Sequence, residues 1–441
     1  MKQTVSYSIK LKMTKASAEV LKQTCGVYRS AVAYIINFLP PHWDSVKAID
    51  YSNAKMMYVE SLIHTVGGQK AVCDFDQKFY KLPSYMRRAA ISAAIGMYSS
   101  WKSNHDNWEK AGCEGAEPVM GTVNNICPAF FRGNTFRMIS DDAAMVKVFA
   151  HNDWVWMPVR MNHSDLKYIR RKISEGWACK APTVEKRFGH YEMRFAMQRA
   201  NELNETPVLD QKICAVDLGI TTDATCCIMD SHGTVLARKF INCGREKDLT
   251  EKMLQRVKEF QRLHGSHDSG VLWHLARNRN LNHAHLIAHR IIELAREYQC
   301  DVIVFEHLDT KGKKHGSKKQ KLAMWNHQVV QNTAESLAHQ YGIRVSHICT
   351  WNTSQLAYDG SGKVLRGRKA FRNTPYDMCL FRTGKMYNCD LNASYNIGAR
   401  YFLRAMLKDL PDAAAEDLGI GSGTQRTLAD LWKLNKVFMV L

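Results

Sequence analysis

The sequence contains no Cys-x-x-Cys pair, although 13 cysteines are scattered along its 441 residues. An odd number of scattered cysteines with a single adjacent pair, Cys226–Cys227, supports neither a disulfide framework nor an ordinary zinc knuckle. We therefore interpret most of these cysteines as small, reduced side chains of a hydrophobic core, as expected of a protein in a cytosol.

The sequence also lacks an apolar run of about 18 residues, the length that a membrane-spanning helix needs. Its first residues, Met1–Tyr7, have no apolar signal-peptide core, so no membrane partner is expected. Acidic residues are outnumbered, because 42 Asp and Glu compare with 61 Lys and Arg, giving a net charge of +19 and a pI near 9.3. A positive field of this size favours polyanions, above all nucleic acid. The length allows two or three domains, and an apolar content of 45% is ample for their cores.

The run Ile213–Ile220, Ile-Cys-Ala-Val-Asp-Leu-Gly-Ile, is the first sign of a functional site. Its apolar residues predict a buried strand that ends at Asp217, before a break at Gly219. A carboxylate at the end of a core strand is poorly solvated, so it normally needs a partner such as a metal ion.

Two more acids occupy comparable positions. Cys300–Glu306 is a second apolar run that ends in an acid, and Asp390 lies at the start of a predicted helix. Each acid alone has a simpler interpretation: a turn for Asp217, a solvated strand end for Glu306 and a helix N-cap for Asp390. Together, in the order strand, strand, helix, they predict one site for the two Mg²⁺ ions of two-metal phosphodiester cleavage.

Three short motifs carry a family resemblance. They are Ala-Val-Asp-Leu-Gly-Ile at 215–220, Val-Phe-Glu-His-Leu at 304–308 and Cys-Asp-Leu-Asn-Ala-Ser-Tyr-Asn-Ile at 389–397. These motifs resemble the three RuvC motifs of the TnpB nucleases of transposons and of the compact type V CRISPR effectors. The resemblance covers residues 206–410 well and the first 200 residues in outline. It implies that Asp217, Glu306 and Asp390 are catalytic and bind two Mg²⁺ ions, for which Mn²⁺ can substitute.

The resemblance also implies a multidomain α/β architecture. An RNase H-like (RuvC) catalytic domain would be C-terminal, preceded by a small, wedge-like β-barrel domain that holds guide RNA and is interrupted by a helical recognition domain. The alternating residues 3–12, the helical spacing at 17–39 and 83–110, and the hairpin patterns within 118–205 agree with this order. The predicted domains are 1–12 with 118–205 (wedge), 13–117 (recognition), 206–348 with 385–441 (RuvC), and 349–384 (an insertion that loads the target strand).

The insertion departs from the family pattern, which usually has a zinc ribbon with two Cys-x-x-Cys pairs at this place. Only Cys379 and Cys389 remain here, ten residues apart. Tetrahedral zinc takes four Cys or His ligands, so we predict no structural zinc and a degenerate, loop-rich module.

Basic residues on several segments are candidates for phosphate contacts. Two predicted helices, at 83–110 and 271–298, place arginines outward, and the lysine-rich stretch 311–321 could close over a bound strand as a lid. All of these residues have an equally ordinary interpretation as solvated surface. The candidates are Arg87, Arg88, Arg277, Arg279, Lys311, Lys313, Lys314, Lys318, Lys319, Arg366, Arg368, Lys369 and Arg372.

The function that the resemblance implies is RNA-guided DNA cleavage in a prokaryotic cytosol. A guide RNA, derived from a CRISPR array or a transposon end, would pair with a double-stranded DNA target, which a single RuvC site then cuts. Two other interpretations stay open: a guide-dependent DNA-binding regulator that does not cut, and a guide-independent RuvC-like resolvase or transposase-associated protein. A homodimer also stays open for a chain of this size.

Overall fold

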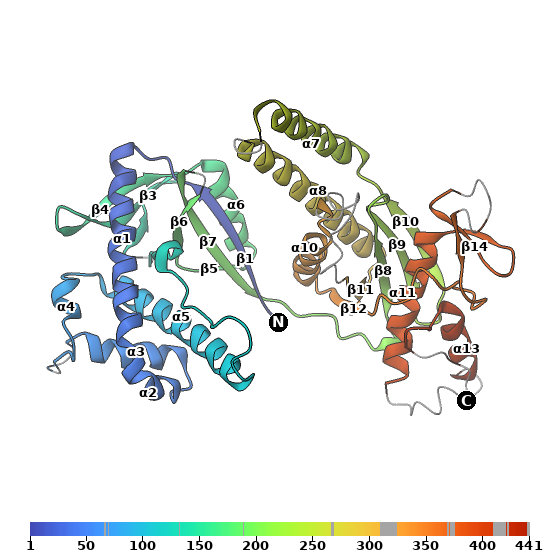
Figure 1. Cartoon of the computed structure of the whole chain (residues 1–441), viewed down its shortest axis with the longest axis horizontal. Helices are drawn as coiled ribbons and strands as arrows, with labels where there is room; N and C mark the ends of the chain where they lie inside the picture. The colour runs from blue at the N-terminus through green and yellow to red at the C-terminus, as the bar shows by residue number, and fades with distance from the viewer. Residues whose placement is uncertain are drawn as a thin grey trace. The chain divides into compact units, whose positions relative to one another are not determined.

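The computed structural model divides into two compact units, each of which mixes helices with strands (Figure 1). One unit is Lys2–Ala200, and the other begins at Asn201 and includes Met1. The predicted multidomain α/β class is therefore confirmed. The structure describes residues 1–65, 68, 70–131, 133–187, 189–265, 269–308, 324–367, 370, 375–408, 420 and 423–438.

Two long helices form the helical part of the first unit. Helix α1 (Lys15–Phe38) begins at Thr14, whose side chain accepts a hydrogen bond from Ser17 N, and α5 (Ser84–Lys110) packs against it. Both helices were predicted from their apolar spacing, and their buried faces share one core. Shorter elements complete this part: η1 (Pro40–His42), α2 (Trp43–Lys47), α3 (Ser52–Ile63), α4 (Phe75–Lys78) and η2 (Val123–Asn125).

The strands of the first unit form two sheets. One contains β1 (Lys2–Lys10), β7 (His190–Ala200), β5 (Ala178–Cys179) and β6 (Thr183–Arg187), and the other contains β2 (Phe136–Met138), β3 (Ala143–Ala150) and β4 (Asp153–Arg160). Single bridges, such as Lys12 with Arg160, join them, but the described strands do not close into a barrel. The barrel prediction is therefore not confirmed. The sequence patterns also missed helix α6 (His163–Ser174), which packs against β1 and β7.

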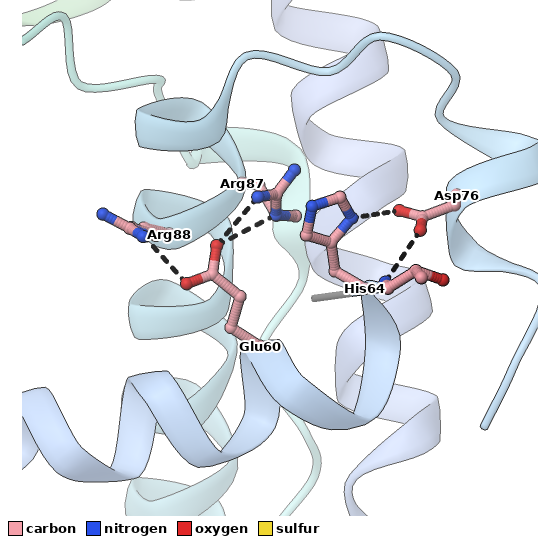
Figure 2. A network of polar contacts seen from close by, with 6 residues as sticks. Glu60, His64, Asp76, Arg87 and Arg88 are labelled. Carbon is pink, nitrogen blue, oxygen red and sulfur yellow. Dashed lines mark hydrogen bonds and ion pairs between the residues drawn. The ribbon is translucent and has the colours of Figure 1, made fainter. Parts of the chain in front are cut away.

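A buried ion pair joins α3 to α5. Figure 2 shows the Glu60 carboxylate between Arg87 and Arg88, with Arg87 Nη2 at 2.9 Å from Glu60 Oε1 and Arg88 Nε at 2.9 Å from Oε2. The prediction that Arg87 points outward is wrong, because its side chain is only 10% exposed and is held by Glu60. An unpaired buried carboxylate is costly. Pairing Glu60 with Arg87 is therefore worth more than the water that the arginine would contact at the surface. Figure 2 also shows His64 Nδ1 beside Asp76, 2.7 Å from its Oδ1.

The second unit is built on a five-stranded mixed sheet. The strands are β8 (Lys212–Leu218), β9 (Ala224–Asp230), β10 (Val235–Ile241), β11 (Val302–Glu306) and β12 (Arg344–Ile348), in the spatial order β10-β9-β8-β11-β12. The first three strands pair antiparallel, whereas β11 pairs parallel with both β8 and β12. Strands β8 and β11 are central and buried on both faces, which explains their almost unbroken apolar runs.

Helices cover both faces of this sheet (Figure 1). On one face, α8 (Gly270–Glu297) and α10 (His327–Gln340) pack with Val216 and Phe305, and α7 (Gly244–His264) packs on α8. On the other face, α11 (Cys389–Met406) and α13 (Leu428–Phe438) pack with Ala215 and Val304. The short η3 (Val208–Asp210) precedes β8.

The insertion between β12 and α11 has a sheet and a core of its own. Its strands are β13 (Leu365–Arg366), β14 (Met378–Leu380) and β15 (Met386–Asn388). A small core of Ala357, Phe381 and the two remaining thiols, Cys379 and Cys389, lies beneath them. Apolar packing of this kind holds the insertion together locally; the absence of zinc stays a prediction.

No helix within the described ranges is both long and apolar enough to cross a membrane.

Candidate functional site

Asp217 and Glu306 lie at the same edge of the sheet. In the parallel pair β8–β11, Val216 lies opposite Phe305, so the next residue of each strand, Asp217 and Glu306, is at the same level. Side chains alternate along a strand, and Ala215 faces α11, so both carboxylates face the α11 side. Asp217 and Glu306, on two neighbouring parallel strands, therefore lie on the face of the sheet that α11 covers.

Asp390 reaches that face from the first turn of α11. The cap of this helix is Asn388, whose Oδ1 accepts hydrogen bonds from the backbone N–H groups of Asp390 and Leu391, each at 3.0 Å. The alternative that Asp390 itself is the N-cap is therefore wrong. Because Asn388 satisfies the helix end, the Asp390 carboxylate is not needed as a cap, and it accepts a hydrogen bond from the Thr222 side chain instead.

The three acids form one electrostatic cluster in which the charges of the other two act on Asp217. Burial and the charges of Glu306 and Asp390 raise the pKa of Asp217 well above its usual value, against the opposing charge of Arg366. Burial also raises the pKa of Glu306 and of Asp390. The charges of Glu306 and Asp390 both raise the pKa of Asp217, whereas neither is among the causes that shift the pKa of the other. Like charges held together in this way strongly disfavour ionisation unless cations are present.

The backbone of Glu306 is fixed by a hydrogen bond, but one oxygen of its carboxylate lacks a hydrogen-bond partner among the described residues. Gln331 Nε2 on α10 donates to its backbone oxygen at 2.8 Å, which fixes the strand end. The residue is only 9% exposed, and its Oε1 has no hydrogen-bond partner among the described residues. The charge of Arg400 and the Thr353 side chain lower the Glu306 pKa, but burial outweighs them. A buried carboxylate oxygen without a donor in the protein is suited to act as a metal ligand.

Arg400 on α11 is a supporting residue that the sequence analysis missed. Its guanidinium donates to four backbone oxygens, those of Cys349, Trp351, Thr424 and Arg426, at 2.6–3.1 Å. These bonds fix the chain that follows β12 to the helix. The signal in the sequence was an arginine inside the apolar stretch Ile397–Leu403, where a buried cation needs several acceptors.

The two asparagines of the third motif are structural as well. Asn392 donates to Leu356 O and accepts from Tyr358 N, each at 2.8 Å. Asn396 donates to Thr353 O and to Leu356 O, each at 2.9 Å. Together they fasten the start of the insertion to α11, so this part of the motif builds the wall of the site.

Among the candidate phosphate-binding residues that lie in the described ranges, Arg366 is the one beside the acids. It lies on β13, is exposed and donates to Ser354 O at 2.9 Å. Its charge lowers the pKa of Asp217 and of Asp390. An arginine that is exposed and yet faces two carboxylates can also bind a phosphate oxygen.

The remaining candidates lie elsewhere. Arg277 and Arg279 are exposed on α8, where Arg277 lies over the Trp273 ring, and Arg88 is half-buried beside Glu60. None of these arginines belongs to the acidic cluster. Lys311, Lys313, Lys314, Lys318, Lys319, Arg368, Lys369 and Arg372 lie outside the described residues.

The donor set fits hard divalent cations. It consists of carboxylate oxygens, the ligands that Mg²⁺ and Mn²⁺ prefer, and it includes Glu306 Oε1, which has no hydrogen-bond partner among the described residues. The three acids do not lie within 4.8 Å of one another as one group of ligand atoms. Among the described residues, two other groups do: Asp223–Cys243–His283 and His105–Asp106–Glu109.

Among the comparisons with known proteins, one solved structure shares the fold of this chain. A model of the Aq_aa04 family matches residues 5–150, which is less than half of the chain, and no curated protein matches. The cryo-EM structure of a Cas12f1–sgRNA–target DNA complex matches with a TM-score of 0.54 and 14% identity, over 87% of this chain and 82% of Cas12f1.

Two further solved structures are Cas12-type effectors. CasPhi-2 (Cas12j) bound to crRNA matches with a TM-score of 0.49 and 11% identity, over 91% of this chain and 98% of that chain. C2c1 of Alicyclobacillus acidoterrestris in complex with single-guide RNA matches with a TM-score of 0.42 and 9% identity, over 88% and 69%. At these identities the likeness concerns the fold alone, and it is the Cas12f1 fold that this chain shares.

Proposed function

We propose that the protein is an RNA-guided DNA endonuclease that hydrolyses a phosphodiester of its target at a single RuvC-type site. The observation that carries the proposal is the position of Asp217, whose charge is coupled to Glu306 on the neighbouring strand and to Asp390 on α11. Three carboxylates held together destabilise the fold unless cations neutralise them. A cluster of this kind is therefore more typical of a catalytic site than of a structural one.

The three acids and Arg366 would have different roles in the hydrolysis. Two divalent ions, Mg²⁺ or in its place Mn²⁺, supply an activated water and stabilise the departing 3′ oxygen when they are bound. Asp217, Glu306 and Asp390 would hold these ions, since the charges of Glu306 and Asp390 both act on Asp217. Arg366 would orient a non-bridging oxygen of the scissile phosphate from the exposed side.

Several features support the RuvC assignment and the partners. The sheet has a hairpin pair first and parallel strands afterwards, which is the arrangement that an RNase H-like fold requires. Cas12f1, whose fold this chain shares, is bound to sgRNA and target DNA in its structure. The net charge of +19 suits a guide RNA and a double-stranded DNA target. The choice between TnpB nucleases and compact type V effectors rests on the three motifs, and either would act in a prokaryotic cytosol.

We assign the domains accordingly. The strands of the first unit would form the wedge-like guide-binding domain and its helices the recognition domain, while the sheet with α7, α8, α10, α11 and α13 would be the RuvC domain. The insertion would load the target strand. The residues are 1–12 with 118–205, 13–117, 206–348 with 385–441, and 349–384, in that order.

Purification with bound RNA, followed by a cleavage assay, tests the proposal. Sequencing the copurified RNA gives the guide, and a plasmid library with the matching target and randomised flanks is the substrate. The parent should cut this library only with Mg²⁺ or Mn²⁺. Asp217→Ala should bind the target but not cut it, whereas Asp210→Ala, an exposed acid on η3, should cut like the parent.

Two results would reject the proposal in favour of the alternatives. A discrete RNA without any cutting indicates a guide-dependent regulator. Cutting that does not depend on RNA indicates a resolvase-like or transposase-associated enzyme.

A further inference from the structure

A cavity of about 400 Å³ opens at the same sheet edge as the acids, but on the opposite face of the sheet. Leu218, Gly219 and Ile220 line it, and they directly follow Asp217. Leu218 packs into the core under α8, whereas Asp217 faces α11. The cavity is therefore separated from the candidate catalytic centre by the end of one strand.

The wall of the cavity is suited to a flat ring. The Trp325 and His327 rings lie with their centroids 4.6 Å apart, and Leu254, Ala284 and Ile287 add apolar surface. Asn280 Nδ2 donates to Met324 O at 2.6 Å, which anchors the backbone next to Trp325. An indole held in this way offers a stacking surface at little cost in entropy.

The polar groups of the cavity are centred on a buried carboxylate. His283 Nε2 lies 3.2 Å from Asp223 Oδ1, and Lys247 Nζ lies 3.1 Å from the same oxygen. Against the effect of burial, hydrogen bonding from His283 lowers the pKa of Asp223, so this carboxylate is held ionised beside the cavity. This Asp223–His283 pair offers a polar edge to a ligand, while Lys258 places a cation at the wall for a phosphate.

We propose that this cavity binds one unpaired nucleotide of a nucleic-acid strand, with its base against Trp325 and its polar edge toward His283. A nucleobase combines an apolar face with a hydrogen-bonding edge, which is what these walls complement, and the volume suffices for one nucleoside. That the strand is the one presented to Asp217 rests on the proposed function. The cavity would hold a nucleotide near the scissile phosphate and so help to position the strand.

Binding of the four deoxynucleoside 5′-monophosphates to the full chain in EDTA, followed by saturation-transfer NMR, tests this directly. The parent should bind at least one of them. Trp325→Ala should weaken binding about tenfold, as expected from the loss of one base stack. Ala284→Trp, which fills the cavity, should abolish it. Lys252→Ala, an exposed change on α7 that does not line the cavity, should have no effect.

The outcomes separate this proposal from the nuclease proposal. Thermal melting shows whether Ala284→Trp is folded; if it is not, Trp325→Ala alone decides. Binding that persists in Asp217→Ala supports the cavity whatever the cleavage assay shows. If the parent binds none of the four nucleotides, or if Trp325→Ala binds as tightly as the parent, the inference is overturned while the cleavage result stands on its own.

Discussion

Asp217 is the residue on which the electrostatics of the site depend. It ends a buried strand, and its pKa is raised by burial and by the charges of Glu306 and Asp390. The register of β8 and β11 places Asp217 and Glu306 at the same level, and α11, which carries Asp390, packs on the same face of the sheet. The cluster therefore destabilises the metal-free protein at neutral pH.

We expect metal-free Asp217→Asn to be more stable than the parent at pH 7.5, by roughly 1 kcal/mol after allowance for partial solvent exposure. A raised pKa means that the folded protein binds the proton more tightly than the unfolded chain. This proton binding stabilises the folded parent fully below about pH 4, the pKa of Asp217 in the unfolded chain. The stabilisation is lost as the pH rises through the raised pKa of the folded protein, and it returns as the pH falls.

Denaturant unfolding at pH 7.5 and near pH 4 measures the difference, which should disappear at the acidic pH. Mg²⁺ should stabilise the parent, by about 2.7 kcal/mol at a hundredfold excess over its Kd, but not the variant. Asp248→Asn, an exposed acid on α7, is the control and should behave like the parent. A variant that is less stable than the parent at neutral pH would refute the electrostatic argument.

Arg400→Met should be strongly destabilising, by about 3–5 kcal/mol, because four backbone oxygens lose their charged donor at once. It should also raise the pKa of Glu306, which the arginine now lowers, and so move the acid limb of the cleavage profile to higher pH. The matched change on the next turn, Arg404→Met, removes a more exposed arginine and should cost less. If Arg400→Met and Arg404→Met lose the same amount of stability, Arg400 does not have the supporting role assigned to it.

Single residues were predictable from sequence where local pattern determined their position. Asp217 and Glu306 end apolar runs and Asp390 opens a helix, so all three could be picked out in advance. The apolar stretch around Arg400 indicates a buried arginine, but not its acceptors, which are backbone oxygens 24 to 51 residues away in the chain. The outward placement of Arg87 failed for a related reason, since its partner Glu60 lies on another helix.

Among the elements, α11 determines the shape of the site. Its asparagines hold the insertion, its first turn presents Asp390, and Gly398 lets it approach the sheet. A Cβ at Gly398 would lie 3.1 Å from Met229 Sδ and 3.3 Å from Ala215 Cβ. The methionine can move, but Ala215 Cβ belongs to strand β8, so the helix would have to move outward.

We therefore expect Gly398→Ala to lower stability by about 1 kcal/mol, because overpacking outweighs the gain in helix propensity of about 1 kcal/mol. The shift should also weaken cleavage, since Asp390 moves with the helix. Gly96→Ala on α5 adds a Cβ that meets nothing within 4 Å and should be neutral or stabilising. Denaturant unfolding compares the two variants; a stabilised Gly398→Ala would show that the helix has room.

Elements with strong periodicity were predicted well. Helices α1, α5 and α8 begin and end within two residues of the expected 17–39, 83–110 and 271–298. Helix α6 was missed because only Leu166 and Ile169 are buried and strand patterns flank it. The expected barrel depended on long-range strand pairing, which a local pattern does not encode.

For the whole molecule, the excess of positive charge predicts how binding depends on salt. With about six phosphate contacts, affinity for the copurified RNA should fall about 10³-fold between 50 and 200 mM NaCl. The double variant Arg277→Ala/Arg279→Ala should reduce the log–log slope by nearly two, because both arginines are exposed on α8. Arg170→Ala removes a surface charge that Asp141 already pairs and should leave the slope unchanged. Filter binding over a salt series measures this, and an unchanged slope for the double variant would exclude α8 from the RNA surface.

The central claim is that three acids far apart in the chain meet at a shared pair of divalent ions. Isothermal titration of Mn²⁺ into the parent, Asp217→Asn and Asp248→Asn tests it most directly. The account predicts saturable binding by the parent and by Asp248→Asn, and binding at least about tenfold weaker in Asp217→Asn, a loss of about 1.4 kcal/mol or more. Equal affinity and stoichiometry in the parent and in Asp217→Asn would contradict it.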